Sequence, residues 1–141
     1  MLRSTALLLV IALTGCAALK LPPGQENEQT FVRETTKPYQ EAYRIIAKQM
    51  RACYRAMGAF GNGYDIQADL DSAAKTGTIE LYAVGFTGAQ KPEDSIFSRT
   101  VVVTGTQAGA TIKTTGTTPK YVYLTHMTIP TWLTGADSCG P

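Results

Sequence analysis

The fold is decided by the stretch YQEAYRIIAKQMRACYRAMG, residues 39–58. Its apolar residues recur at steps of three and four, which is the spacing of one face of an α-helix. These residues are Tyr39, Ala42, Tyr43, Ile46, Met50, Cys53 and Met57. Thr36 and Pro38 precede the stretch as a suitable cap and a first-turn proline, and Gly58 is typical of a helix end. The sequence therefore predicts one amphipathic helix of about 20 residues.

Further along the chain, apolar residues recur at every second position, which is typical of β-strands. This alternation is clearest at Tyr64, Ile66, Ala68 and Leu70, in the segment 64–71. The other strand candidates are rich in Thr, Val, Ile and Tyr, and they are the segments 30–35, 78–86, 96–104, 110–115 and 121–128. Short connections between consecutive strands favour antiparallel pairing. We predict an α+β fold, in which one long amphipathic helix packs on a mainly antiparallel sheet of roughly four to six strands.

The composition argues against several classes of function. The chain has 141 residues, of which 44% are hydrophobic, and a formal net charge of +2, which suits one globular domain. Its 13 basic residues against 11 acidic residues lack the excess that nucleic-acid binding requires. One His and three Cys provide few metal ligands, and the sequence contains no nucleophile-elbow motif. We therefore expect no enzyme activity, no metal or cofactor, and no nucleic-acid partner.

The first 16 residues have the layout of a secretory signal. Arg3 provides a positive charge, residues 6–13 form an apolar core, and the tetrapeptide LTGC follows at 13–16. The apolar run is shorter than the about 20 residues that span a bilayer. This arrangement resembles the lipobox signal of bacterial lipoproteins. The resemblance implies a diacylglycerol on the Cys16 thiol and cleavage after Gly15, whereas an ordinary secretory signal with an incidental cysteine is the alternative.

The lipobox, the polar Pro- and Gly-containing composition after it and the strand and helix patterns together predict three parts in the chain. Residues 1–15 form the signal peptide, residues 16–29 form the lipidated cysteine with a flexible tether, and residues 30–141 form a single α+β domain. Ala17 follows the lipidated cysteine, where the inner-membrane retention signal of this family usually has Asp. The resemblance thus implies a lipid-anchored protein of the outer membrane of a Gram-negative bacterium, with its domain in the periplasm. Besides the membrane, we expect an envelope protein as its partner.

Two cysteines remain besides Cys16, and an even pair in an oxidising compartment favours a disulfide. We predict a bond between Cys53, on the apolar face of the helix, and Cys139, near the C-terminus. Two free thiols or a redox site are the alternatives. The helix and tail also resemble those of small uncharacterised envelope lipoproteins, a group that implies no activity. This second resemblance rests on Tyr43, Cys53, Trp132, Gly135 and Cys139.

One candidate binding surface is an aromatic patch on the outer face of the sheet. If 78–86 and 121–128 are both strands, side chains of one parity point away from the helix. The predicted members of the patch are Tyr82, Val84, Phe86, Tyr121 and Tyr123. A large exposed aromatic patch on a monomer is typical of a binding site. The alternative is that the C-terminal segment with Trp132, or a loop, covers it as a second small core.

A second candidate surface is a basic face on the helix. Arg44, Lys48, Arg51 and Arg55 recur at steps of four, three and four, so they share one side of the helix. Such a face attracts an anionic membrane or partner. A solvated helix face, with cations that suit the C-terminal end of the helix dipole, is the alternative.

Together these features favour an outer-membrane-anchored lipoprotein that serves as a non-catalytic binding or structural module of the cell envelope. One alternative is an envelope enzyme or small-ligand carrier that acts on cell-wall or lipid fragments, which requires a deep pocket with converging polar groups. Another is an accessory subunit of a secretion or assembly machine.

Overall fold

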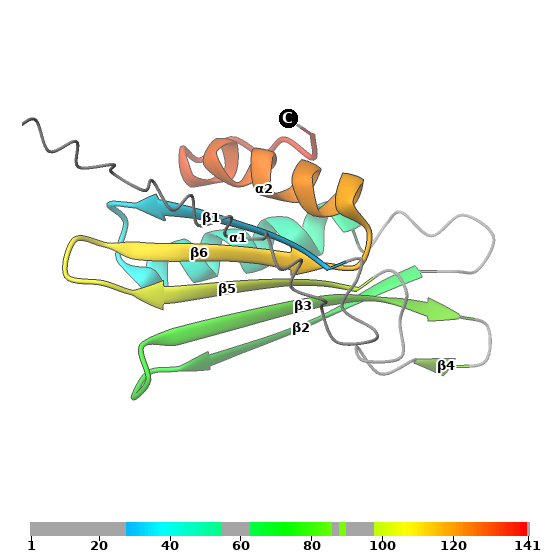
Figure 1. Ribbon diagram of the computed structural model, residues 1–141, viewed down its shortest axis with the longest axis horizontal. Helices are drawn as coiled ribbons and strands as arrows, with labels where there is room; N and C mark the ends of the chain where they lie inside the picture. The colour runs from blue at the N-terminus through cyan, green and yellow to red at the C-terminus, as the bar shows by residue number, and fades with distance from the viewer. Residues whose placement is uncertain (1–27, 55–62, 86–87, 90–97, 141) are drawn as a thin grey trace, which may run out of the picture.

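The computed structural model describes residues 28–54, 63–85, 88–89 and 98–140 (Figure 1). The elements in these ranges are β1 (Gln29–Thr35), α1 (Tyr39–Tyr54), β2 (Gly63–Asp71), β3 (Thr76–Gly85), β4 (Gly88–Ala89), β5 (Arg99–Gly105), β6 (Ala110–Gly116) and α2 (Pro119–Leu133). The predicted signal peptide, the lipidation residue Cys16 and most of the predicted tether lie outside the described residues.

The strands form one antiparallel sheet with the order β1-β6-β5-β3-β2, and the short β4 pairs with the end of β3. The chain leaves β1 at one edge, passes through α1 and enters β2 at the opposite edge. It then returns strand by strand until β6 pairs with β1. The α+β class and the antiparallel sheet predicted from the sequence are confirmed.

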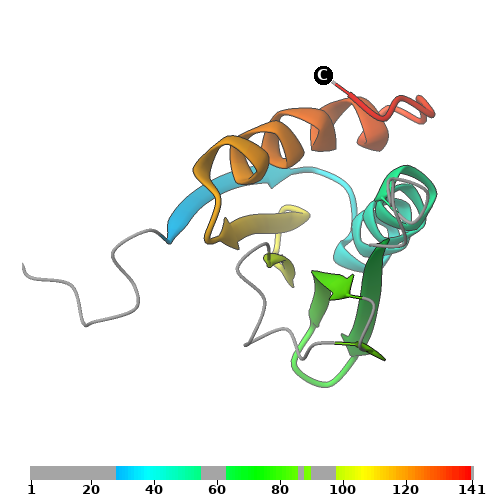
Figure 2. The same cartoon turned by 90° about the vertical axis from the view of Figure 1, so that its right-hand side faces the viewer.

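Both helices cover the same face of this sheet (Figure 2). The helix α1 packs over β2, β3 and β5, and α2 packs over β1 and β6. Fully buried aliphatic residues of the central strands, such as Ile79, Val101 and Ile112, form the floor of the core. Ile46 of α1 and Trp132 of α2 are buried above them. Since strand side chains alternate, the residues between these floor positions lie on the opposite face, which no described helix covers.

The helix α1 begins where the sequence predicted it, and its apolar face is buried as expected. Its predicted end at Gly58 lies outside the described residues. One close contact fixes its position on the sheet: a Cβ at Gly77 would overlap the Tyr43 ring, so glycine allows the ring to lie directly against β3.

The predicted strand 121–128 is wrong, because this segment belongs to α2. Its Thr, Val, Tyr and Ile residues have high β-propensity, and the alternation of its apolar residues resembles that of a strand. In the helix the inward residues are instead Val122, Thr125, Ile129 and Trp132, which follow steps of three and four. Packing on β1 and β6 therefore outweighs the local preference. The described part of the chain thus has two helices over its sheet instead of the one predicted.

The helix α2 ends at a glycine turn. Gly135 has a φ of +93°, a conformation that favours glycine, and its N–H donates to the carbonyl of Trp132 at 2.9 Å. The tail that follows turns back toward the end of α1. In the described ranges, neither helix has the length and apolar character that crossing a membrane requires.

Candidate functional site

The side chain of Arg99 lies in the core at the start of the central strand β5. It has the same parity as Val101 and Val103, which are fully buried against the helices. Only 5% of Arg99 is exposed, at a position where the pattern of the strand calls for an aliphatic residue. A buried cation of this kind needs a compensating interaction.

The described contacts of Arg99 come from hydroxyl groups and aromatic rings. Its Nη1 donates to the Thr125 hydroxyl at 2.9 Å, and that hydroxyl lies 3.1 Å from the Tyr54 hydroxyl. The guanidinium carbon lies 4.5 Å from the centre of the Tyr54 ring, 5.5 Å from that of Tyr121 and 5.9 Å from that of Tyr64. Rings at such distances attract a cation through their π-electrons. The helices α1 and α2 and the strand β2 together build this surrounding.

The described residues provide no carboxylate for Arg99. Within the ranges that the structure covers, the one ion pair joins Lys37 to Glu41 near the start of α1. A guanidinium has five N–H donors, and one hydrogen bond, to Thr125, links that of Arg99 to the described part of the chain. Among the described residues, the charge of Arg99 is thus compensated only by aromatic rings and one hydroxyl, and four of its five donors have no described acceptor.

A cavity of about 310 Å³ opens beside this guanidinium. Its lining residues come from both helices, two strands and the tail, and they are Tyr54, Tyr64, Arg99, Tyr121, Leu124, Thr128, Cys139 and Gly140. This volume is at the lower end of the range of small-molecule sites. Two larger hollows, of about 480 and 350 Å³, lie near residues 105–109, but their polar side chains are exposed or half-exposed. The Arg99 cavity is therefore the better candidate site, because it has a buried charged group in its wall.

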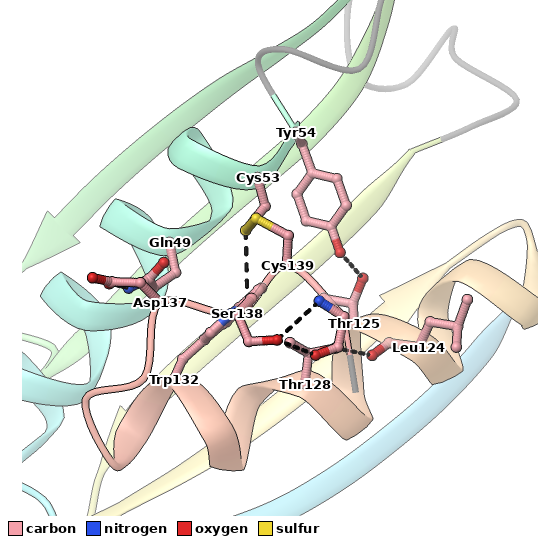
Figure 3. The surroundings of a disulfide bond; sticks show 11 residues. Gln49, Cys53, Tyr54, Leu124, Thr125, Thr128, Trp132, Asp137, Ser138 and Cys139 are labelled. Atoms are coloured by element: carbon pink, nitrogen blue, oxygen red, sulfur yellow. Dashed lines mark hydrogen bonds between the residues drawn. A yellow bond between two sulfur atoms is a disulfide. The ribbon is translucent and has the colours of Figure 1, made fainter.

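Cys139 and Gly140 of the C-terminal tail line one side of this cavity, and Figure 3 shows the surroundings of Cys139. Cys139 forms a disulfide with Cys53 of α1, and their Cα atoms lie 5.2 Å apart. The pairing predicted from the sequence is confirmed. Two hydrogen bonds hold the tail nearby: Gln49 donates to the Asp137 carboxylate, and the Trp132 indole donates to the Ser138 carbonyl. Covalent and polar links thus fix the wall that Cys139 and Gly140 form.

A second inward-pointing arginine lies at the edge of the sheet. The Nε of Arg33 in β1 donates to the Nε2 of His126 in α2 at 3.3 Å, and the Phe31 ring stacks on the imidazole. His126 is 7% exposed, and its Nδ1 has no hydrogen-bond partner among the described residues. Burial, together with the charge of Arg33, lowers the pKa of His126 below its ordinary value. The surroundings of His126 therefore favour the neutral form of its imidazole.

The predicted aromatic patch is not assembled. Tyr82 lies on the outer face of β3, but it is 8% exposed and its hydroxyl donates to the Asp65 carboxylate at 3.1 Å. Burial, the Asp65 contact and nearby negative charges raise the pKa of Tyr82. Tyr121 and Tyr123 are 44% and 48% exposed, but they belong to α2, on the opposite side of the sheet. Strand parity cannot place residues that are in a helix.

The remaining predicted surface residues are only partly described. The side chain of Val84 and the whole of Phe86 lie outside the described residues, as does Arg55 of the basic face. Its other members, Arg44, Lys48 and Arg51, are exposed on α1. Trp132, whose segment was one alternative cover of the aromatic patch, is buried in the core between the helices and the sheet.

Sequence reasoning missed Arg99, although a signal for it was present. The segment 96–104 was correctly expected to contain a strand, and Val101 and Val103 are its apolar inward positions. An arginine two residues before them has the same parity. A charged residue at an inward position of a central strand is unusual, and it therefore marks a candidate functional site.

Comparisons with known proteins add the following findings. No family model matches the chain, and no curated protein matches it. Protein CV1439 from Chromobacterium violaceum is similar in structure, with 12% identity and a TM-score of 0.36, over 77% of this chain and 96% of that one. Protein MLL2253 from Mesorhizobium loti has 15% identity and a TM-score of 0.41, over 79% of this chain and 95% of that one. At these TM-scores the similarities carry no inference about the site.

Proposed function

We propose that this protein is a lipid-anchored, non-catalytic binding module of the outer membrane, which takes a small anionic ligand in the cavity beside Arg99. The observation that carries the proposal is the buried guanidinium, which has no carboxylate partner in the described chain and faces a cavity of about 310 Å³.

The energetics favour an anion at this place. A buried charge is costly unless an opposite charge or several hydrogen bonds compensate it. The described contacts of Arg99 are one hydrogen bond and three aromatic rings. A hydrogen bond between two charged partners in such a site stabilises a complex by about 1.5–3 kcal/mol. An anion would thus bind the Arg99 guanidinium with little further desolvation cost for that group, because folding has already removed it from water.

The chemistry of the lining favours binding over catalysis. Apart from the arginine, the lining side chains are phenols, a threonine, a leucine and a disulfide-bonded cysteine. Such groups hold and orient a ligand through hydrogen bonds and apolar contacts. Among the eight described lining residues, none is a carboxylate or an imidazole that could act as a general base.

The test of the binding proposal is thermal unfolding of the full chain in a non-ionic detergent. Phenylacetate and phenyl phosphate serve as anionic probes, and phenylacetamide serves as their neutral counterpart. A ligand that binds the folded state alone raises the Tm by an amount that grows with its concentration relative to its Kd. We expect at least one of the anions to raise the Tm of the wild type, and neither to raise that of R99M. An equal rise with phenylacetamide, or in R99M, would contradict the proposal.

The anchoring part of the proposal is supported by the lipobox at residues 13–16 and needs its own test. Several acyl chains on one terminus hold a protein on a membrane almost permanently. We expect C16S, expressed in a Gram-negative host, to leave the membrane fraction, whereas C139S remains there. Retention of C16S in the outer membrane would refute the lipid anchor.

A further inference from the structure

We infer that the ligand of the Arg99 cavity is a monocarboxylate with a flat, apolar body, an inference that rests on the proposed function. Three properties of the cavity support this inference. They are the number of charges in the described wall, the hydrogen-bonding edge of the Arg99 guanidinium, and the shape of the surfaces around that guanidinium.

The described part of the wall contains one charged side chain. Among the described lining residues, seven are uncharged and Arg99 provides the single positive charge. One cation neutralises one negative charge. A phosphate monoester near neutral pH carries about 1.5 to 2 negative charges, so one guanidinium would leave part of that charge unpaired. The charge balance therefore favours a monoanion.

The geometry of Arg99 favours a planar carboxylate. A guanidinium forms two parallel N–H···O bonds with a carboxylate when one of its edges is unoccupied. The bond to Thr125 uses Nη1, which leaves the edge formed by Nε and Nη2 without a described hydrogen-bond partner. In turn, the Tyr54 hydroxyl lies within hydrogen-bonding distance of the Thr125 hydroxyl, so Nη1 is held in place. The arginine is thus prepared for a two-pronged contact.

The walls favour an apolar, flat body on that carboxylate. The rings of Tyr54, Tyr64 and Tyr121 surround the guanidinium, and Leu124 and Thr128 complete the α2 side of the cavity. Figure 3 shows Tyr54 of α1 and Leu124, Thr125 and Thr128 of α2 gathered next to the disulfide. A volume of about 310 Å³ equals roughly ten water molecules, which suits a single ring with a short acidic arm.

Calorimetric titration of the detergent-solubilised full chain tests this inference. We expect phenylacetate to bind the wild type at least tenfold more tightly than phenylacetamide, which has the same shape without the charge, and at least tenfold more tightly than phenyl phosphate. R99K, which keeps the charge but loses the two-pronged edge, should bind phenylacetate several-fold more weakly, and R99M more weakly still.

Two variants of α2 provide a second test, which does not depend on whether substitutions at Arg99 impair folding. Tyr121 lines the cavity and Tyr123 does not, yet both are exposed tyrosines of α2. We expect Y121L to weaken phenylacetate binding several-fold and Y123L to leave it within twofold. Tighter, Tyr121-dependent binding of phenyl phosphate would refute the carboxylate inference and leave the anion-binding function standing. Failure of both anions to bind would refute the two together.

Discussion

Two arginines of the sheet point toward α2 and meet neighbouring residues of that helix, yet their surroundings differ. Arg33 belongs to the edge strand β1, is half-buried and donates to His126. Arg99 belongs to the central strand β5, is almost fully buried and donates to Thr125. The first contacts an imidazole stacked on Phe31, and the second contacts a hydroxyl beside a cavity.

The comparison shows that position in the sheet determines what a buried cation can do. At the edge, burial lowers the pKa of Arg33, although water still reaches part of its side chain. At the centre, Arg99 is desolvated, and the described protein contacts compensate its charge only in part. We therefore assign a structural role to Arg33 and a ligand-binding role to Arg99.

The largest effect should follow from loss of the disulfide, which supports the Arg99 side of the molecule. The bond joins residues separated by 86 positions, and the chain-entropy model gives about 4.6 kcal/mol for a loop of this length. We expect the C53S/C139S double variant to lose about that much unfolding free energy in urea. It should also lose affinity for phenylacetate, because the tail forms one wall of the cavity.

Reduced wild-type protein is the matched control for that double variant. Both should show a changed fluorescence of Trp132, the single tryptophan, whose indole donates to the tail. An unfolding free energy within about 1 kcal/mol of the oxidised wild type would contradict the structural role of the disulfide.

The next effect separates the two arginines by ligand binding. R99M removes the charged partner and should weaken phenylacetate binding at least tenfold, which corresponds to about 1.4 kcal/mol. R33M should leave the affinity within twofold, because Arg33 does not line the cavity. Calorimetry of both variants measures the difference. Equal losses in the two would indicate a general disturbance of α2 instead of a specific site.

A smaller effect, on the pH dependence of stability, separates the Arg33–His126 contact from Arg99. The pKa of His126 is lowered in the folded state. Below pH 6.5 the His126 imidazole therefore binds a proton more readily in the unfolded chain than in the folded protein. Stability is thus fully present above about pH 7 and falls as the pH drops through 6.5 toward the folded pKa. We expect the urea unfolding free energy of H126Q to show a shallower fall from pH 7 to pH 5. R99M should keep the wild-type slope, and a wild-type slope in H126Q would be the contrary result.

The smallest effect concerns a cation that is neither buried nor part of a cavity. Lys37 and Glu41 form an ion pair one helical turn apart near the start of α1, and both side chains are about a third or more exposed. Such pairs stabilise a protein by about 0.3–0.5 kcal/mol, and salt weakens them. K37M should therefore reduce the unfolding free energy by no more than that in low salt and by nothing measurable in high salt. A loss above about 1 kcal/mol would contradict the view that the effect of substituting Lys37, Arg33 or Arg99 decreases with the exposure of the side chain.

Much of the fold could be predicted because local patterns and packing agree there. The steps of three and four around Ile46 and Met50 belong to a helix whose buried face has the same spacing. Likewise, the alternation in 64–71 belongs to β2. In α2 local propensity and tertiary packing disagree. Val122 and Thr125 are typical strand residues, but tertiary contacts hold them in a helix.

The candidate site could be predicted only in part. Cysteine count and position gave the bond between Cys53 and Cys139, because pairing needs no knowledge of the sheet. The cavity depends instead on three-dimensional convergence. Tyr54, Arg99 and Tyr121 come from α1, β5 and α2, and only the helical state of 119–133 brings the last of them beside the arginine.

The most direct test is nuclear magnetic resonance of the full chain labelled with ¹⁵N-arginine, with phenylacetate added stepwise. R99K and R33K assign the two Nε–H signals. The account predicts that the Arg99 signal shifts in a saturable manner while the Arg33 signal stays in place. If the Arg99 signal does not move at saturating phenylacetate, or if both signals move together, Arg99 is not the anchor of a ligand site.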